Sequence, residues 1–112
     1  MSNRSVYLDR YAAPEKGHTD RDTSWWPAPY RDIDTGMAAM SMLLTAVDEG
    51  LGTCFFGIPR PRYSSFRAAF GVPDTFTPIG AISFGYSEEP VRDLRARRRS
   101  IEDVVHWHRW GN

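Results

Sequence analysis

The hydrophobic and polar positions divide the chain into a polar opening, an apolar middle and a charged closing segment. Residues 32–50 start with polar side chains and continue into an uncharged apolar run over residues 36–47. At a helical period of about 3.6 residues, apolar side chains cover nearly the whole circumference, and only Ser41, Thr45 and Asp48 form a polar stripe. A chain of 112 residues has little material to surround such a helix, so we expect it to pack against another chain.

The ends of this predicted helix carry their own signals. Asp34 or Thr35 can accept a hydrogen bond from the free amides at its start. Gly50 follows the last apolar turn, where a left-handed cap is expected. These signals confine the helix to residues 32–50.

Two apolar segments that contain glycine predict strands. Residues 53–58 form the end of the segment GLGTCFFGI and predict a short buried strand, which Pro59 and Pro61 terminate. Residues 79–86 predict a second strand. The small side chains of this second strand leave room for a group to lie close against one of its faces.

A short amphipathic segment lies between the two predicted strands. Residues 62–71 predict a helix with Phe66, Ala69 and Phe70 directed inward and Gly71 as its cap. The order helix, strand, helix, strand and tail is typical of an α+β fold. We expect one domain that consists of an irregular arm (1–31), a core (32–95) and a C-terminal tail (96–112).

Proline, glycine and charged residues dominate the arm, which predicts irregular structure. Its exception is the segment TSWWPAPY, where Trp25, Trp26 and Tyr30 stand in a proline-rigid loop. These rings either cover a hydrophobic edge or form the wall of a ligand pocket or a subunit contact. A charged, extended connector over residues 87–99 leads from the core into the tail, where Ser100 and Asp103 fit a capping box.

Composition and charge narrow the function classes. The chain has 14 basic and 14 acidic residues and a formal net charge of zero, which argues against a general nucleic-acid binder. No apolar run is long enough to span a bilayer of about 30 Å. The single cysteine, Cys54, excludes a disulfide within the chain. These features predict a soluble cytoplasmic protein that binds neither nucleic acid nor membrane.

Few side chains are arranged for acid–base, nucleophilic or metal chemistry. His106 and His108 are two positions apart and point in different directions on a helix, so we expect no metal site. Cys54 lies inside a predicted buried strand, where a free thiol is usually inert. No Ser–His–Asp constellation or phosphate-loop signature appears, and we therefore name no catalytic side chain.

The glycine-flanked strand and the closing basic cluster are the remaining candidates. The backbone amides of Phe56, Gly57 and Ile58 would be free to donate where the strand ends, which suits a flat heteroaromatic ring. One of the arginines 97–99 could bind a phosphate through its forked guanidinium. A buried edge strand and a solvated basic linker would account for the same residues.

In order along the chain, these segments resemble the C-terminal half of the nitroreductase family. The similarity lies in WWPAPYRDIDTGMAAMSMLLTAVDEGLGTCFFGIP, then FRAAFGVPDTFTPIGAISFGY, then RRRSIEDVVHWHRW, and so covers roughly residues 23–112. The resemblance implies a homodimer of an α+β fold, with helices packed on an antiparallel sheet and FMN at the dimer interface. It implies hydride transfer from NAD(P)H through the flavin to a nitro, quinone or similar acceptor.

The resemblance also implies which residues bind the cofactor. The turn at Phe56, Gly57 and Ile58 would place backbone near the redox-active ring nitrogen. Arg98, with Arg99 or Arg97 as a close substitute, would contact the FMN phosphate.

Family members carry an Arg-Arg-Ser-x-Arg type segment in an N-terminal half, and the nearest sequence here is Arg4-Ser5. We therefore expect a truncated domain that supplies one part of the site, completed by a homodimer partner or by a separate N-terminal half. The alternative is a non-catalytic subunit that dimerises with a full-length relative.

Overall fold

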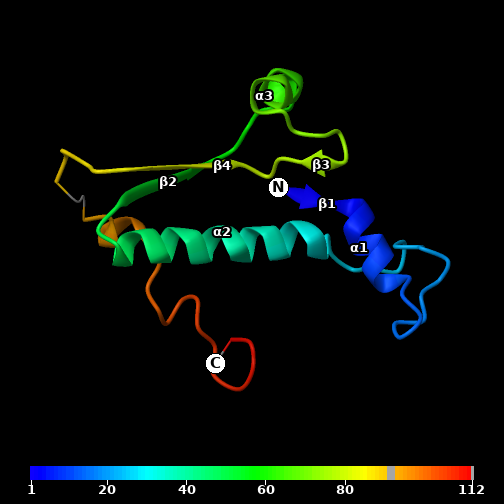
Figure 1. The fold of residues 1–112 in the computed structure, drawn as a ribbon. Helices are drawn as coiled ribbons and strands as arrows, with labels where there is room; N and C mark the ends of the chain where they lie inside the picture. The colour runs from blue at the N-terminus through cyan, green and yellow to red at the C-terminus, as the bar shows by residue number, and fades with distance from the viewer. Residues whose placement is uncertain (91–92, 112) are drawn as a thin grey trace.

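The computed structural model describes residues 1–90 and 93–111, which form an α+β fold. Its elements are β1 (Ser2–Asn3), α1 (Arg4–Tyr11), α2 (Tyr30–Asp48), β2 (Gly52–Phe56), the 3₁₀ turn η1 (Arg60–Arg62), α3 (Tyr63–Phe70), β3 (Phe76–Thr77), β4 (Ala81–Gly85) and the 3₁₀ turn η2 (Arg95–Arg97). The long helix α2 lies along the β2–β4 sheet, α3 stands at one end of that sheet, and the C-terminal segment runs away from the body (Figure 1). Within the described ranges, no helix combines the length and apolarity needed to cross a bilayer.

The predicted long helix is present, but its start was placed too late. It begins at Tyr30, with Pro29 at the N-cap position and no side-chain cap. The prediction of Asp34 or Thr35 as the cap was therefore wrong. The Thr35 hydroxyl instead donates to the carbonyl of Arg31 at 2.7 Å, one helical turn back. Proline favours the first positions of a helix because it has no amide hydrogen to leave unpaired and its φ is already helical.

The C-terminal cap of α2 is confirmed. Gly50 has a φ of 74°, in the left-handed region. The amide of Leu51 donates to the carbonyl of Ala46 at 2.8 Å, and that of Gly50 donates to the carbonyl of Val47 at 3.0 Å. This pair of hydrogen bonds is the Schellman arrangement, which satisfies carbonyls that the helix leaves free.

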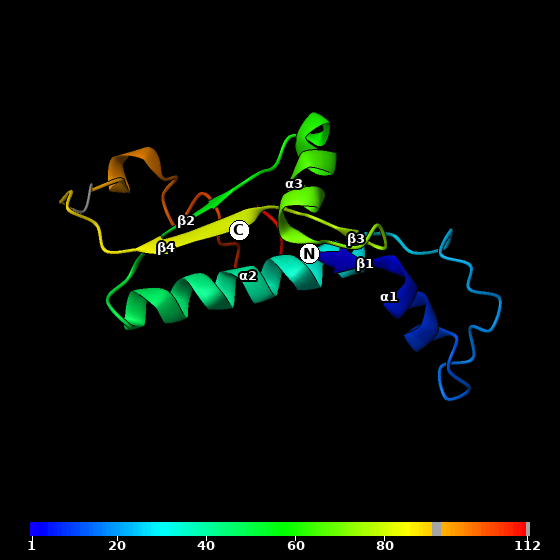
Figure 2. The same ribbon diagram turned by 45° about the horizontal axis from the view of Figure 1, so that its top comes forward.

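Strands β2 and β4 pair antiparallel, with Cys54 opposite Ser83 and Phe55 opposite Ile82. The prediction of a buried strand was wrong, because Phe55 and Phe56 remain 43% and 49% exposed. The reason is that, among the described residues, this sheet has two strands, so each strand has an open edge, and α2 lies along one face of the sheet (Figure 2).

The small residues expected to permit a close approach do so at Gly80. A Cβ atom there would lie 2.5 Å from Cζ of Phe55 and 2.8 Å from the carbonyl oxygen of Phe56. A Cβ atom at Gly85, the last residue of β4, would meet nothing within 4 Å. The glycine at position 80 therefore lets strand β4 pass close to the Phe55–Phe56 segment.

The predicted short helix corresponds to α3, but only one of the three residues expected to point inward is partly shielded from solvent. Phe66 is half-buried, but Ala69 and Phe70 are exposed, and that part of the prediction was wrong. The helix is held by its polar side chains instead. The Tyr63 hydroxyl donates to the carbonyl of Pro78 at 3.1 Å, and the Arg67 guanidinium donates to the carbonyl of Phe76 at 2.7 Å.

The arm is less irregular than its composition predicts. Its first residues form β1, which pairs antiparallel with β3, and then α1. The side-chain oxygen of Asn3 accepts from the amides of Ser5 and Val6, at 2.9 and 3.2 Å, and this caps α1. The prediction of irregular structure over this part was wrong because Asn3 was not recognised as an N-cap.

The aromatic residues of the arm pack mainly on one another. Trp26 makes edge contacts with three tyrosines and one tryptophan, at centroid separations of 4.9–6.0 Å: Tyr7, Tyr11, Trp25 and Tyr30. His18 stacks on Trp25 at 4.7 Å. Of the alternatives for these rings, the structure favours a covering role: the rings shield one another from solvent and hold residues 12–29 against α1.

The tail contains η2 and a closing turn. Two residues of the predicted connector, Val91 and Arg92, lie outside the described residues. The Ser100 hydroxyl accepts from the amide of Asp103 at 3.2 Å, as a capping box requires, but one turn forms there and no helix follows. Among the described residues of the tail, five large apolar side chains are exposed: Ile101, Val104, Val105, Trp107 and Trp110.

Candidate functional site

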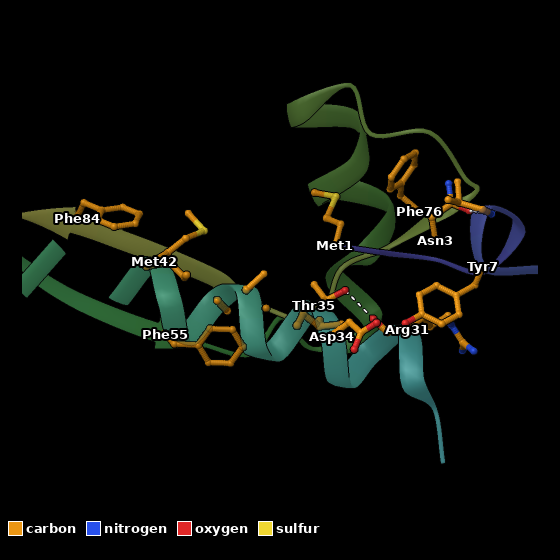
Figure 3. A pocket seen from close by; sticks show the side chains of 16 residues that line it. Met1, Asn3, Tyr7, Arg31, Asp34, Thr35, Met42, Phe55, Phe76 and Phe84 are labelled. Atoms are coloured by element: carbon orange, nitrogen blue, oxygen red, sulfur yellow. Dashed lines mark hydrogen bonds between the residues drawn. The ribbon is translucent and has the colours of Figure 1, made fainter. Parts of the chain in front are cut away.

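An apolar groove lies between α2 and the β2–β4 sheet, and β1 and α1 close one end of it (Figure 3). Its volume is about 650 Å³. Apolar side chains from three elements line its length: Ala38 and Met42 of α2, Phe55 of β2, and Ile82 and Phe84 of β4. A volume of this size falls in the range of about 300–1,000 Å³ that small-molecule sites occupy.

Polar groups gather at the end of the groove near the start of α2. Asn3, Arg31, Asp34 and Thr35 line this end. The Arg31 guanidinium lies 3.6 Å from the carboxylate of Asp32, and both side chains are about one-third exposed. The arrangement combines an apolar body with a few polar groups at one end, a combination common in ligand sites.

The predicted glycine turn begins where β2 ends. Phe56 is the last residue of the strand, and Gly57 and Ile58 lead out of the sheet toward η1. Among the described residues, no acceptor is hydrogen-bonded to the backbone amide of Gly57 or Ile58. A Cβ atom on Gly57 would meet nothing within 4 Å. The turn therefore presents backbone donors beside open space.

The predicted phosphate-binding arginines lie elsewhere in the chain. Arg98 directly follows η2 with extended backbone, and Arg99 donates to the carbonyl of Asp103 at 2.9 Å. In both views η2 lies at the end of the β2–β4 sheet opposite to α3, whereas β2 runs from there toward α3 (Figures 1 and 2). Within one chain, the structure therefore does not bring Arg98 and Arg99 together with the turn at Phe56.

Side chains with intrinsic reactivity are scattered. Cys54 is exposed, so the expectation that it lies inside a buried strand was wrong; its thiol lies 3.8 Å from the carbonyl oxygen of Phe55. His106 packs against the ring of Trp110 at 4.2 Å. Across residues 1–90 and 93–111, no three His, Cys, Asp or Glu side chains are grouped as a metal site requires.

The resolved pKa shifts also lie away from the groove and the turn. Backbone hydrogen bonding lowers the pKa of Glu15, with a further contribution from the Arg10 guanidinium. Hydrogen bonds from the hydroxyl and amide of Ser24 lower the pKa of Asp22. These carboxyls lie on the exposed arm. The groove and the turn offer apolar surface and backbone donors for binding.

Sequence reasoning missed the N-terminal contribution to the groove. Asn3, Val6 and Tyr7 line its closed end together with the first turn of α2. The signal was available, since asparagine is among the best N-cap residues and no proline occurs before Pro14. The contact itself depends on the pairing of β1 with β3, which links residues 2–3 to residues 76–77.

Comparisons with known proteins found one matching family model and a similar protein. The family model described as the nitroreductase family matches residues 10–86, a range that includes α2, β2, the glycine turn and β4. The chain is 34% identical over 97 residues to an uncharacterised 15.4 kDa protein, encoded in the 5′ region of ask, from Mycolicibacterium smegmatis. The alignment covers 76% of this chain and 62% of the relative, so the chain spans less than two-thirds of that protein's length. No solved structure matches.

Proposed function

Because the chain belongs to the nitroreductase family, we propose that it is a subunit of an FMN-dependent oxidoreductase. Its reaction would take electrons from NAD(P)H and deliver them to a nitro, quinone or similar acceptor. FMN supplies the hydride chemistry when bound, and the protein supplies binding, orientation and shielding from water. We place this activity in the cytoplasm, where a single unpaired cysteine, Cys54, stays reduced.

The glycine turn is the observation that carries this proposal. The free amides of Gly57 and Ile58 can donate to the acceptor atoms of a flat ring, and the open space at Gly57 lets a ring approach the backbone closely. The half-exposed Phe56 next to the turn offers an apolar contact. These groups fit a flavin ring without the participation of any charged side chain.

The phosphate of FMN requires a second part of the site. Arg98 and Arg99 can bind it bidentately, but they lie at the other end of the sheet from the turn. We propose that a second copy of the chain, or a separate N-terminal half, brings the two parts together. The exposed apolar side chains of α2, among them Met37, Leu44 and Val47, support such an association.

A visible absorption spectrum of the purified chain, with and without added FMN, tests the proposal. We expect a yellow protein with a shifted flavin band, at once or after FMN is added. Gly57→Ala should weaken FMN binding, because its methyl group fills the open space beside the turn. Gly85→Ala is the matched control, since its Cβ atom also meets nothing within 4 Å. A chain that takes up no FMN, alone or with a supplied N-terminal half, would contradict the proposal.

A non-catalytic interaction subunit is the second candidate. The separation of Arg98 from the Phe56–Ile58 turn in one chain favours it, since a chain without a complete site still has an exposed apolar helix. This function predicts a stable complex with a full-length relative whose flavin content and turnover do not change. Size-exclusion chromatography with absorbance at the flavin band distinguishes the two candidates.

A further inference from the structure

A second basic cluster follows the glycine turn directly. Arg60 and Arg62 occupy η1, two and four residues after Ile58. The whole segment 50–73 contains three arginines, the third being Arg67, and no acidic residue. A segment with this charge in a chain of zero net charge creates a local positive potential beside the turn.

The guanidinium groups of Arg60 and Arg62 are available for a ligand. Both residues are exposed, and within the described parts of the chain neither side chain makes a hydrogen bond or an ion pair. Other arginines of the body are engaged: Arg21 pairs with Asp9 at 2.6 Å, and Arg67 donates to the carbonyl of Phe76. Unlike the guanidinium groups of Arg21 and Arg67, those of Arg60 and Arg62 therefore bind no group among the described residues.

The backbone holds these arginines close to the turn. Pro59 and Pro61 restrict the chain, and the amide of Arg62 donates to the carbonyl of Pro59 at 2.8 Å, which closes η1. Consecutive Cα atoms are at most about 3.6 Å apart along the chain direction, so Arg60 begins within roughly 7 Å of Ile58. A ligand seated at the turn would thus be within reach of both side chains.

We propose that Arg60 and Arg62 bind a phosphate monoester on a molecule seated at the Gly57–Ile58 turn. Such a group carries about −1.5 to −2 charges and three strong acceptor oxygens near neutral pH. The planar fork of arginine matches those oxygens bidentately. This inference rests on the proposed function only for the carrier: it would be NADPH through its 2′-phosphate, or FMN, whose phosphate Arg60 and Arg62 would then bind in place of Arg98 and Arg99.

The test begins with inorganic phosphate as the probe. Amide and guanidinium resonances of the ¹⁵N-labelled chain are followed by NMR during a phosphate titration at constant ionic strength, with chloride as the reference anion. We expect saturable shifts at Gly57, Ile58, Arg60 and Arg62. The double variant R60Q/R62Q should bind phosphate about tenfold more weakly or worse. The double variant R95Q/R109Q removes the same charge elsewhere and should behave like the unmodified chain.

Two ligand pairs then identify the carrier. If R60Q/R62Q weakens binding of FMN but not of riboflavin, the phosphate is that of the flavin. If it weakens binding of NADPH but not of NADH, measured by equilibrium dialysis, the phosphate is that of the electron donor. The absence of saturable shifts, or equal phosphate affinity in R60Q/R62Q and R95Q/R109Q, would overturn the inference. Phosphate binding at the arginines without any flavin binding would refute the proposed function and leave the anion site standing.

Discussion

The close approach at Gly80 gives a quantitative test of the packing between β4 and the end of β2. The substitution Gly80→Ala adds one methyl group at a position where the backbone needs no positive φ. That methyl carbon would lie 2.5 and 2.9 Å from two ring carbons of Phe55 and 2.8 Å from the carbonyl oxygen of Phe56. Carbon–carbon contacts are optimal near 3.5–4.0 Å, so all three atoms must move.

The expected cost follows from which of these atoms can move. The ring of Phe55 is 43% exposed and can rotate outward. The carbonyl of Phe56 belongs to the backbone of β2, whose pairing with Ala81 fixes it. Overpacking of this kind costs about 1–3 kcal/mol, and we expect about 2 kcal/mol. With an unfolding entropy of about 2.1 cal/mol/K per residue, that corresponds to a fall of roughly 8 °C in the melting temperature of this 112-residue chain.

Urea denaturation followed by circular dichroism measures this change, with Gly85→Ala as the control. The control adds the same methyl group to the last residue of β4, in open space, so its free energy of unfolding should change by less than about 0.5 kcal/mol. If both variants unfold at the same urea concentration, the Phe55–Phe56 segment does not pack on Gly80 as described, and the reasoning fails.

Three further predictions concern α2 and the arm. If a second copy covers α2, Leu44→Lys removes a burial contribution of about 1.5–3 kcal/mol, and light scattering should show a dimer become a monomer; an unchanged mass would contradict this. Gly50→Ala should destabilise by about 1–2 kcal/mol because of its φ of 74°, whereas Gly36→Ala, inside the helix, should stabilise by up to about 1 kcal/mol in urea melts. The pKa of Asp22 is lowered in the folded chain, so its contribution to stability is present above the ordinary aspartate pKa and is lost as the pH falls through the lowered value. Ser24→Ala removes the hydroxyl hydrogen bond but keeps that of the amide, so an NMR titration should show the pKa of Asp22 rise part of the way toward its ordinary value, and an unchanged pKa would refute the assignment.

Local signals predicted the elements whose causes are local. The apolar run and Gly50 predicted α2 and its left-handed cap, and Gly71, with a φ of 61°, likewise ends α3. Apolar composition with nearby glycines and prolines predicted β2 and β4 within two residues at each end. Backbone conformation at such positions depends on a few neighbouring residues, which a sequence displays directly.

Burial and juxtaposition could not be predicted in the same way. The apolar segment at Phe55 predicted a buried strand, but exposure depends on how many strands and helices surround it, and here the sheet has two strands. The prediction of Phe70 as an inward residue failed for the same reason, since no element among the described residues covers it and it remains 71% exposed.

The sequence by itself determined the membership of the family, the helix–strand–helix–strand order and the glycine turn at Gly57. Only the tertiary structure decided that β1 and α1 close one end of a groove and that Arg98 and Arg99 lie at the other end of the sheet from the turn. It also decided that the side chains of Arg60 and Arg62 have no partner among the described residues. The physical reason is that short-range hydrogen bonds and steric limits are encoded over a few residues, whereas proximity between distant segments depends on the pairing of strands and on the packing of helices against them.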